Sequence, residues 1–77
     1  MKASEIKEGV VYRNRGKGTT LRRVIAIGIE HRPRRWYSDS RPPDSPGVLF
    51  ADMYGRHENL YLSSFAAWAG GEYREEQ

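Results

Sequence analysis

The chain has 77 residues, no cysteine and a formal net charge of +3. This length predicts one small domain that buries about 60–65% of the surface exposed by its unfolded chain. The lack of cysteine excludes disulfides and thiolate metal sites. No apolar run approaches the ~20 residues of a membrane-spanning helix, and the opening residues lack the apolar stretch of a signal peptide, so we expect a cytoplasmic protein without a membrane partner.

The first part of the chain predicts a helical turn followed by a β-hairpin. Residues 3–8 can form one helical turn. The β-branched and aromatic run 10–13 predicts a strand, and the two glycines within 14–18 predict a hairpin loop after it. Residues 19–29 predict the longest strand, which alternates at first, then becomes continuously apolar, and is expected to bend at Gly28.

The second part predicts two more strands and a short helix. Residues 30–46 contain four prolines, which remove backbone donors, so this stretch predicts a long Arg/Pro-rich loop. Strands are expected at 47–53 and 59–62, and a short helix at 65–69. The mostly acidic tail 72–77 is expected to fray.

Together these elements predict an all-β domain with a short C-terminal helix. Four to five antiparallel strands within residues 1–71 would form a small SH3-like barrel, because closure removes exposed strand edges. The third strand is apolar on both faces, so the pattern fits a monomer or a homodimer. The expected core residues are Ile6, Val10 or Val11, Tyr12, Leu21, Val24, Ile25, Ile27, Val48, Phe50, Leu60, Leu62, Phe65 and Trp68.

Positive charge is concentrated in residues 13–41. That segment has nine Lys/Arg against two acidic residues, a net charge of +7, whereas residues 1–12 are balanced and residues 42–77 carry −4. Two aromatic residues, Trp36 and Tyr37, lie within the basic segment. Clustered arginines beside aromatic side chains are typical of an anion-binding surface, with nucleic acid as the first candidate.

Several stretches resemble small uncharacterised proteins encoded by tailed phages and prophages. The resemblance rests on Gly9 and Tyr12, the Arg-rich hairpin, the strand from Arg23 to Gly28, the proline-broken middle, and the ending Ser64-Phe65-Ala66-Ala67-Trp68. It implies a phage or prophage origin, and hence the host cytoplasm, but no activity. The opening also resembles small barrels of the SH3, KOW and Tudor types, many of which bind nucleic acid and many of which bind peptides.

The candidate binding site for nucleic acid or another anion combines the hairpin with the long loop. If the loop folds back over the hairpin, the cations would contact phosphates and the aromatic residues would stack on bases. In the alternative, the arginines are solvated or paired with acidic residues, Trp36 plugs the core and Tyr37 packs on a proline. The candidate residues are Arg13, Arg15, Lys17, Arg22, Arg34, Arg35, Trp36 and Tyr37.

No residue pattern indicates catalysis, a cofactor or a metal site. His31 and His57 lack close ligand spacing, and nothing positions a serine for a catalytic triad. We therefore expect a binding module and not an enzyme. The leading hypothesis is nucleic-acid binding, and the alternative is a phage accessory protein that binds and modulates a host protein through the same basic face.

Overall fold

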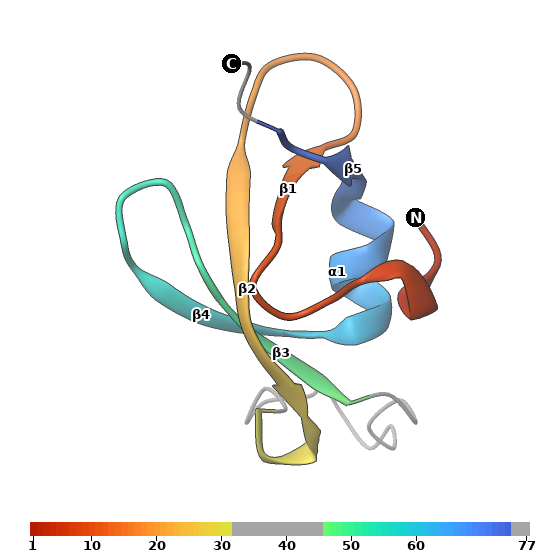
Figure 1. Ribbon diagram of the computed structural model, residues 1–77, viewed down its shortest axis with the longest axis vertical. Helices are drawn as coiled ribbons and strands as arrows, with labels where there is room; N and C mark the ends of the chain where they lie inside the picture. Colours follow the sequence, from red (N-terminus) through yellow and green to blue (C-terminus); the bar gives the residue numbers. More distant parts are fainter. Residues whose placement is uncertain (32–45, 75–77) are drawn as a thin grey trace, which may run out of the picture.

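The protein is described by a computed structural model over residues 1–31 and 46–74. In these ranges five antiparallel strands form one sheet in the order β4-β3-β2-β1-β5 (Figure 1). The strands are β1 (Val11–Asn14), β2 (Leu21–Gly28), β3 (Gly47–Ala51), β4 (His57–Tyr61) and β5 (Ala69–Glu72). The helical elements are the 3-10 turns η1 (Ala3–Glu5) and η2 (Ile29–His31) and the helix α1 (Leu62–Trp68).

The four strands predicted from the sequence are present with shifted ends, but the C-terminal segment differs from the prediction. Helix α1 begins directly after β4, three residues earlier than expected, and the chain then forms β5 where the helix was predicted to close. Gly70 permits this course because a Cβ atom there would lie 2.7 Å from the carbonyl oxygen of Asn14. Strand β5 therefore pairs with β1 and includes Glu72, with which the predicted acidic tail begins.

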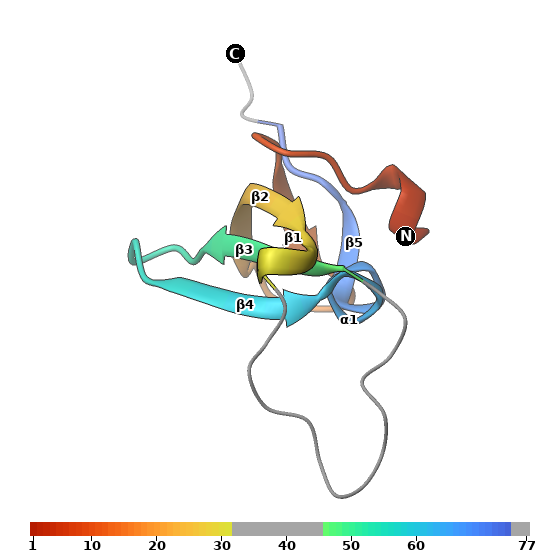
Figure 2. The same cartoon turned by 90° about the horizontal axis from the view of Figure 1, so that it is seen from below.

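The sheet does not close into a barrel in the described part of the chain. Strands β4 and β5 are its two edges, so the expected closed SH3-like barrel is not confirmed. The physical reason lies in the connection, because α1 joins the end of β4 directly to the start of β5. As Figures 1 and 2 show, the helix lies between these edge strands and packs beside the N-terminal segment. The terminal amine of Met1 donates to the carbonyl oxygen of Ala66 at 3.2 Å.

A bulge in β2 explains the change in its hydrophobic pattern. Val24 pairs with Phe50, but Ala26 and not Ile25 pairs with Leu49, so the register shifts by one residue. The inserted Ile25 is 38% exposed, whereas the sequence predicted it in the core. The bulge thus lies three residues before Gly28, the expected bulge or bend site, and it changes which side chains face inward.

The core lies between the sheet and α1 and is dominated by aromatic contacts. Phe65 is fully buried, and its ring centroid lies 5.8 Å from that of Tyr12, 5.4 Å from Phe50 and 5.2 Å from Trp68. Most of the expected core is confirmed, with Val10 and not Val11 as the packed valine. The buried residues are Ile6, Tyr12, Val24, Val48, Phe50, Phe65, Ala66 and Ala69.

Tyr12 connects this core to the N-terminal segment. Its hydroxyl group accepts a hydrogen bond from the amide of Lys7 at 2.7 Å and donates one to the carbonyl oxygen of Glu5 at 3.1 Å. Burial raises the pKa of Tyr12. The tyrosine therefore fixes the turn that leads into β1, which is the strand that carries part of the candidate site.

Candidate functional site

Strands β1 and β2 divide the basic residues of the hairpin between two faces. Tyr12 pairs with Arg22, and because Tyr12 is buried, Arg22 also lies on the core face. Arg13 pairs with Leu21, and Val11 pairs with Arg23, so these four side chains lie on the opposite, outer face. Arg22, a predicted member of the site, is therefore separated by the sheet from Arg13.

The guanidinium group of Arg22 lies over two aromatic rings of the core. Its Cζ atom is 4.8 Å from the ring centroid of Phe50 and 4.3 Å from that of Trp68. Burial lowers the pKa of Arg22, while the carboxylates of Glu58 and Asp52 act in the opposite direction. Its contacts are those of a side chain that covers the core, and a cation in this position stabilises the fold.

Four other cations of the hairpin are exposed, and we call them the basic hairpin surface: Arg13, Arg15, Lys17 and Arg23. Arg13 and Arg23 are diagonal neighbours on the outer face, a placement that separates residues by about 7–8 Å. Arg15 and Lys17 lie in the loop at the end of the hairpin. None of the four forms an ion pair with another residue of the described ranges.

Hydrogen bonds of Asn14 hold the loop that carries Arg15 and Lys17. The Asn14 Nδ2 atom donates to the carbonyl oxygens of Arg15 and Lys17, at 2.9 and 3.1 Å, and its Oδ1 atom accepts from the amide of Thr20 at 2.9 Å. The amide of Arg15 donates to the carbonyl oxygen of Trp68 at 3.1 Å. The loop is thus anchored to the end of α1, and two of its cations sit on an organised turn.

Three acidic residues of the described ranges lie near basic residues outside the hairpin. Glu30 lies 3.7 Å from His31, Asp52 lies 3.7 Å from Arg56, and Glu72 lies 3.8 Å from Arg74. All three pairs are local in the chain. The expected alternative, in which acidic side chains pair with the hairpin arginines, is therefore not seen within 1–31 and 46–74.

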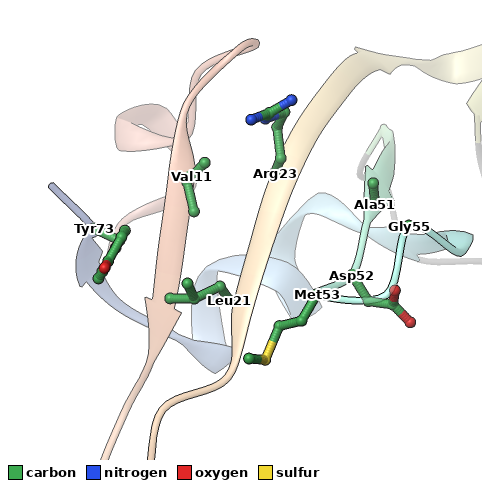
Figure 3. A pocket seen from close by; sticks show the side chains of 8 residues that line it. All are labelled: Val11, Leu21, Arg23, Ala51, Asp52, Met53, Gly55 and Tyr73. Atoms are coloured by element: carbon green, nitrogen blue, oxygen red, sulfur yellow. The ribbon is translucent and has the colours of Figure 1, made fainter. Parts of the chain in front are cut away.

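An open groove of about 640 Å³ lies beside the basic hairpin surface on the outer face. We call it the outer groove. Figure 3 shows the apolar side chains of Val11, Leu21, Met53 and Tyr73 around it, with Arg23 at one side. Ala51, Asp52 and Gly55 complete its lining. Leu21, which the sequence predicted in the core, instead forms part of this outer surface.

Tyr73 is an aromatic residue of the site that the sequence analysis missed. Its amide donates to the carbonyl oxygen of Val11 at 2.8 Å, which continues the pairing of β5 with β1. This places a ring that is 39% exposed beside the hairpin. The residue stood in a predicted acidic tail, and only the pairing of β5 with β1 brings it to the groove.

The predicted loop residues of the site, Arg34, Arg35, Trp36 and Tyr37, lie outside the described residues. The described chain on either side of them ends at His31 and resumes at Pro46. Both positions lie at the end of β2 where Gly28 pairs with Gly47, whereas the basic hairpin is at its other end (Figure 1). The hairpin alone therefore forms the part of the site that the structure brings together.

The histidines show no arrangement of metal ligands. His31 lies 3.7 Å from the adjacent Glu30, and His57 is exposed in β4. In the two described ranges no group of three or more His, Cys, Asp or Glu side chains is placed to hold a metal ion. No helix there is both long and apolar enough to cross a membrane.

Comparisons with family models, with curated proteins and with solved structures find no significant match to this chain.

Proposed function

We propose that this protein is a binding module whose basic hairpin surface contacts the phosphates of nucleic acid. The observation that carries the proposal is the group of four exposed cations, Arg13, Arg15, Lys17 and Arg23, none of which has an ion-pair partner in the described ranges. Three arginines in this group offer the planar donor geometry that suits phosphate oxygens. Arg22 is not part of this surface, because it covers the core.

We also propose that the sheet is an opened variant of an SH3-like barrel. Four consecutive strands form antiparallel neighbours, and the fifth returns after a single short helix to pair with the first. The bulge in β2 adds the curvature that such a sheet needs. This architecture does not decide among ligands, and the phage or prophage origin stays a prediction.

The salt dependence of binding tests the proposed function. A fluorescently labelled single-stranded 12-mer should bind with an anisotropy change, and the logarithm of its affinity should fall with the logarithm of salt concentration. Four phosphate contacts give a slope of about −3, since each contact contributes about −0.7 on a single strand. A slope near zero, or no binding at low salt, contradicts the proposal.

Two double variants with equal charge change locate the surface. R13Q/R23Q removes two cations of the outer face, and K2Q/K7Q removes two exposed lysines that precede β1. R13Q/R23Q should reduce the magnitude of the salt-dependence slope by about 1.4, and K2Q/K7Q should leave the slope unchanged. Equal effects of the two would mean that binding follows net charge and not this surface.

If nucleic acid does not bind, the alternative from the sequence is an acidic protein surface. The same variants discriminate this case, because a partner docked on the hairpin would be released by R13Q/R23Q and retained by K2Q/K7Q. Nuclease treatment of the mixture before capture removes any bridge formed by nucleic acid.

A further inference from the structure

We propose that the outer groove takes an unpaired base of a single-stranded nucleic acid, stacked on Tyr73, while Arg23 contacts the adjoining phosphate. This inference rests on the proposed function and deepens it, because phosphate contacts alone do not distinguish a single strand from a duplex. The juxtaposition that supports it is an apolar and aromatic groove lined on one side by a cation that has no ion-pair partner in the described ranges.

The groove exposes apolar and aromatic side chains on the outer face of the sheet. Met53 is 52% exposed and Tyr73 is 39% exposed, and they stand around the half-buried Val11 and Leu21. An aromatic ring and a flexible thioether suit a flat, sequence-variable surface such as a base. Its volume lies within the range of about 300–1,000 Å³ that is typical of small-ligand sites.

The charges around the groove select a ligand with an anionic backbone. Arg23 lines the groove, and Arg13 pairs in register with Leu21, which also lines it. Phosphates on either side of an inserted base would therefore meet cations. A duplex keeps its bases stacked on each other and offers only phosphates to this face, so it gains nothing from Tyr73.

The carboxylate of Asp52 also lines the groove, where contacts within the β3–β4 turn hold it. Its Oδ1 atom accepts hydrogen bonds from the amides of Tyr54 and Arg56, at 2.8 and 2.9 Å. The Nε atom of Arg56 lies 3.7 Å from its Oδ2 atom. Asp52 thus shapes the β3–β4 turn, from which Met53 reaches the groove (Figure 3).

Three probes of equal length separate base stacking from phosphate contacts: a single-stranded dT 12-mer, the same strand with abasic sugars at all internal positions, and a 12-base-pair duplex. The wild-type protein should bind the dT strand about 5- to 150-fold more tightly than the abasic strand, as expected for one stacked base. Y73A should remove that difference by weakening only dT binding, and Y73F should retain it. R13Q/R23Q should weaken the binding of both the dT strand and the abasic strand.

The outcomes distinguish the two proposals. Equal affinity of wild-type protein for dT and abasic strands overturns base insertion while leaving phosphate binding intact, and this comparison needs no variant. Binding of the duplex as tight as that of the dT strand would also overturn base insertion while leaving phosphate binding intact. No binding to any of the three probes at low salt overturns the proposed function itself. Far-ultraviolet circular dichroism of Y73A checks that the variant is folded.

Discussion

Arg22 and Arg23 are adjacent in the chain, but β2 places them on opposite faces with different physical roles. The guanidinium group of Arg22 covers the rings of Phe50 and Trp68, and burial lowers its pKa. Arg23 is exposed beside the outer groove and has no ion-pair partner in the described residues. A count of basic residues therefore overestimates a binding surface, because strand alternation assigns part of the charge to the fold.

The largest expected effect on stability comes from a comparison of two aromatic residues, Phe65 in the core and Tyr73 on the outer face. F65A removes a fully buried ring that contacts Tyr12, Phe50 and Trp68. Such a change costs about 3–5 kcal/mol, which is a large part of the stability of so small a domain. Y73A removes a ring from the outer face and should cost about 1 kcal/mol or less. Urea denaturation followed by tryptophan fluorescence measures both.

The opposite ranking would contradict this assignment of faces. If Y73A destabilised the protein as much as F65A, then Tyr73 would belong to the core and the outer groove would not be a free surface. The slopes of the two urea curves should also agree with that of the wild type, so that the change in midpoint reports stability.

The two arginines provide the next comparison. R22A should destabilise the protein by about 1–3 kcal/mol, because it removes a cation and an aliphatic stem from two aromatic rings. R23A should change stability by no more than about 0.5 kcal/mol but should weaken oligonucleotide binding. Urea denaturation and anisotropy titrations of the same preparations measure the two effects.

R22K refines this comparison, since lysine keeps the charge and loses the planar guanidinium group. We expect R22K to recover only part of the stability lost in R22A. If R22K and R22A were both as stable as the wild type, the stacking of Arg22 would contribute nothing to stability. If R22A weakened nucleic-acid binding without destabilising the fold, Arg22 would have to be returned to the binding surface, as the sequence predicted.

Local patterns predicted β1 to β4 and the hairpin, but not which face each residue takes after the bulge. Alternation from Arg22 and Val24 would place Ala26 inward, whereas the bulge at Ile25 brings Ile27 toward the core instead. A continuous apolar run gives no sign of where an extra residue is inserted, because every position in it tolerates burial. The exposure of Ile25 was therefore not readable from the sequence.

The aromatic partner of the site was unpredictable for another reason. Tyr73 joins the groove because β5 pairs with β1, which is sixty residues away in the chain. A segment that contains Gly70 and Gly71 has little strand propensity of its own, and the close approach of Gly70 to Asn14 explains why glycine stands there. Tertiary pairing, which no local pattern encodes, thus brought Tyr73 to the outer groove.

The smallest expected effect concerns the β3–β4 turn, which carries Met53 to the groove. The pKa of Asp52 lies below its ordinary value of 3.8, mainly because the backbone amide of Arg56 donates a hydrogen bond to its carboxylate. Burial acts in the opposite direction, and a second hydrogen bond, from the amide of Tyr54, lowers the pKa further. A lowered pKa in the folded state means that this carboxylate stabilises the fold above about pH 4, and that the contribution is lost as the pH falls through the folded pKa.

D52N separates the charge of this turn from its shape, since asparagine keeps an oxygen acceptor for the two amides. The variant should be slightly less stable than the wild type at pH 7, and the difference between their urea midpoints should be smaller at pH 3. A difference that is the same at both pH values would mean that the hydrogen-bond geometry, and not the carboxylate charge, holds the turn. Because the Arg56 side chain is exposed, added salt should weaken the part of the effect that comes from Arg56 and leave the backbone hydrogen bonds in place.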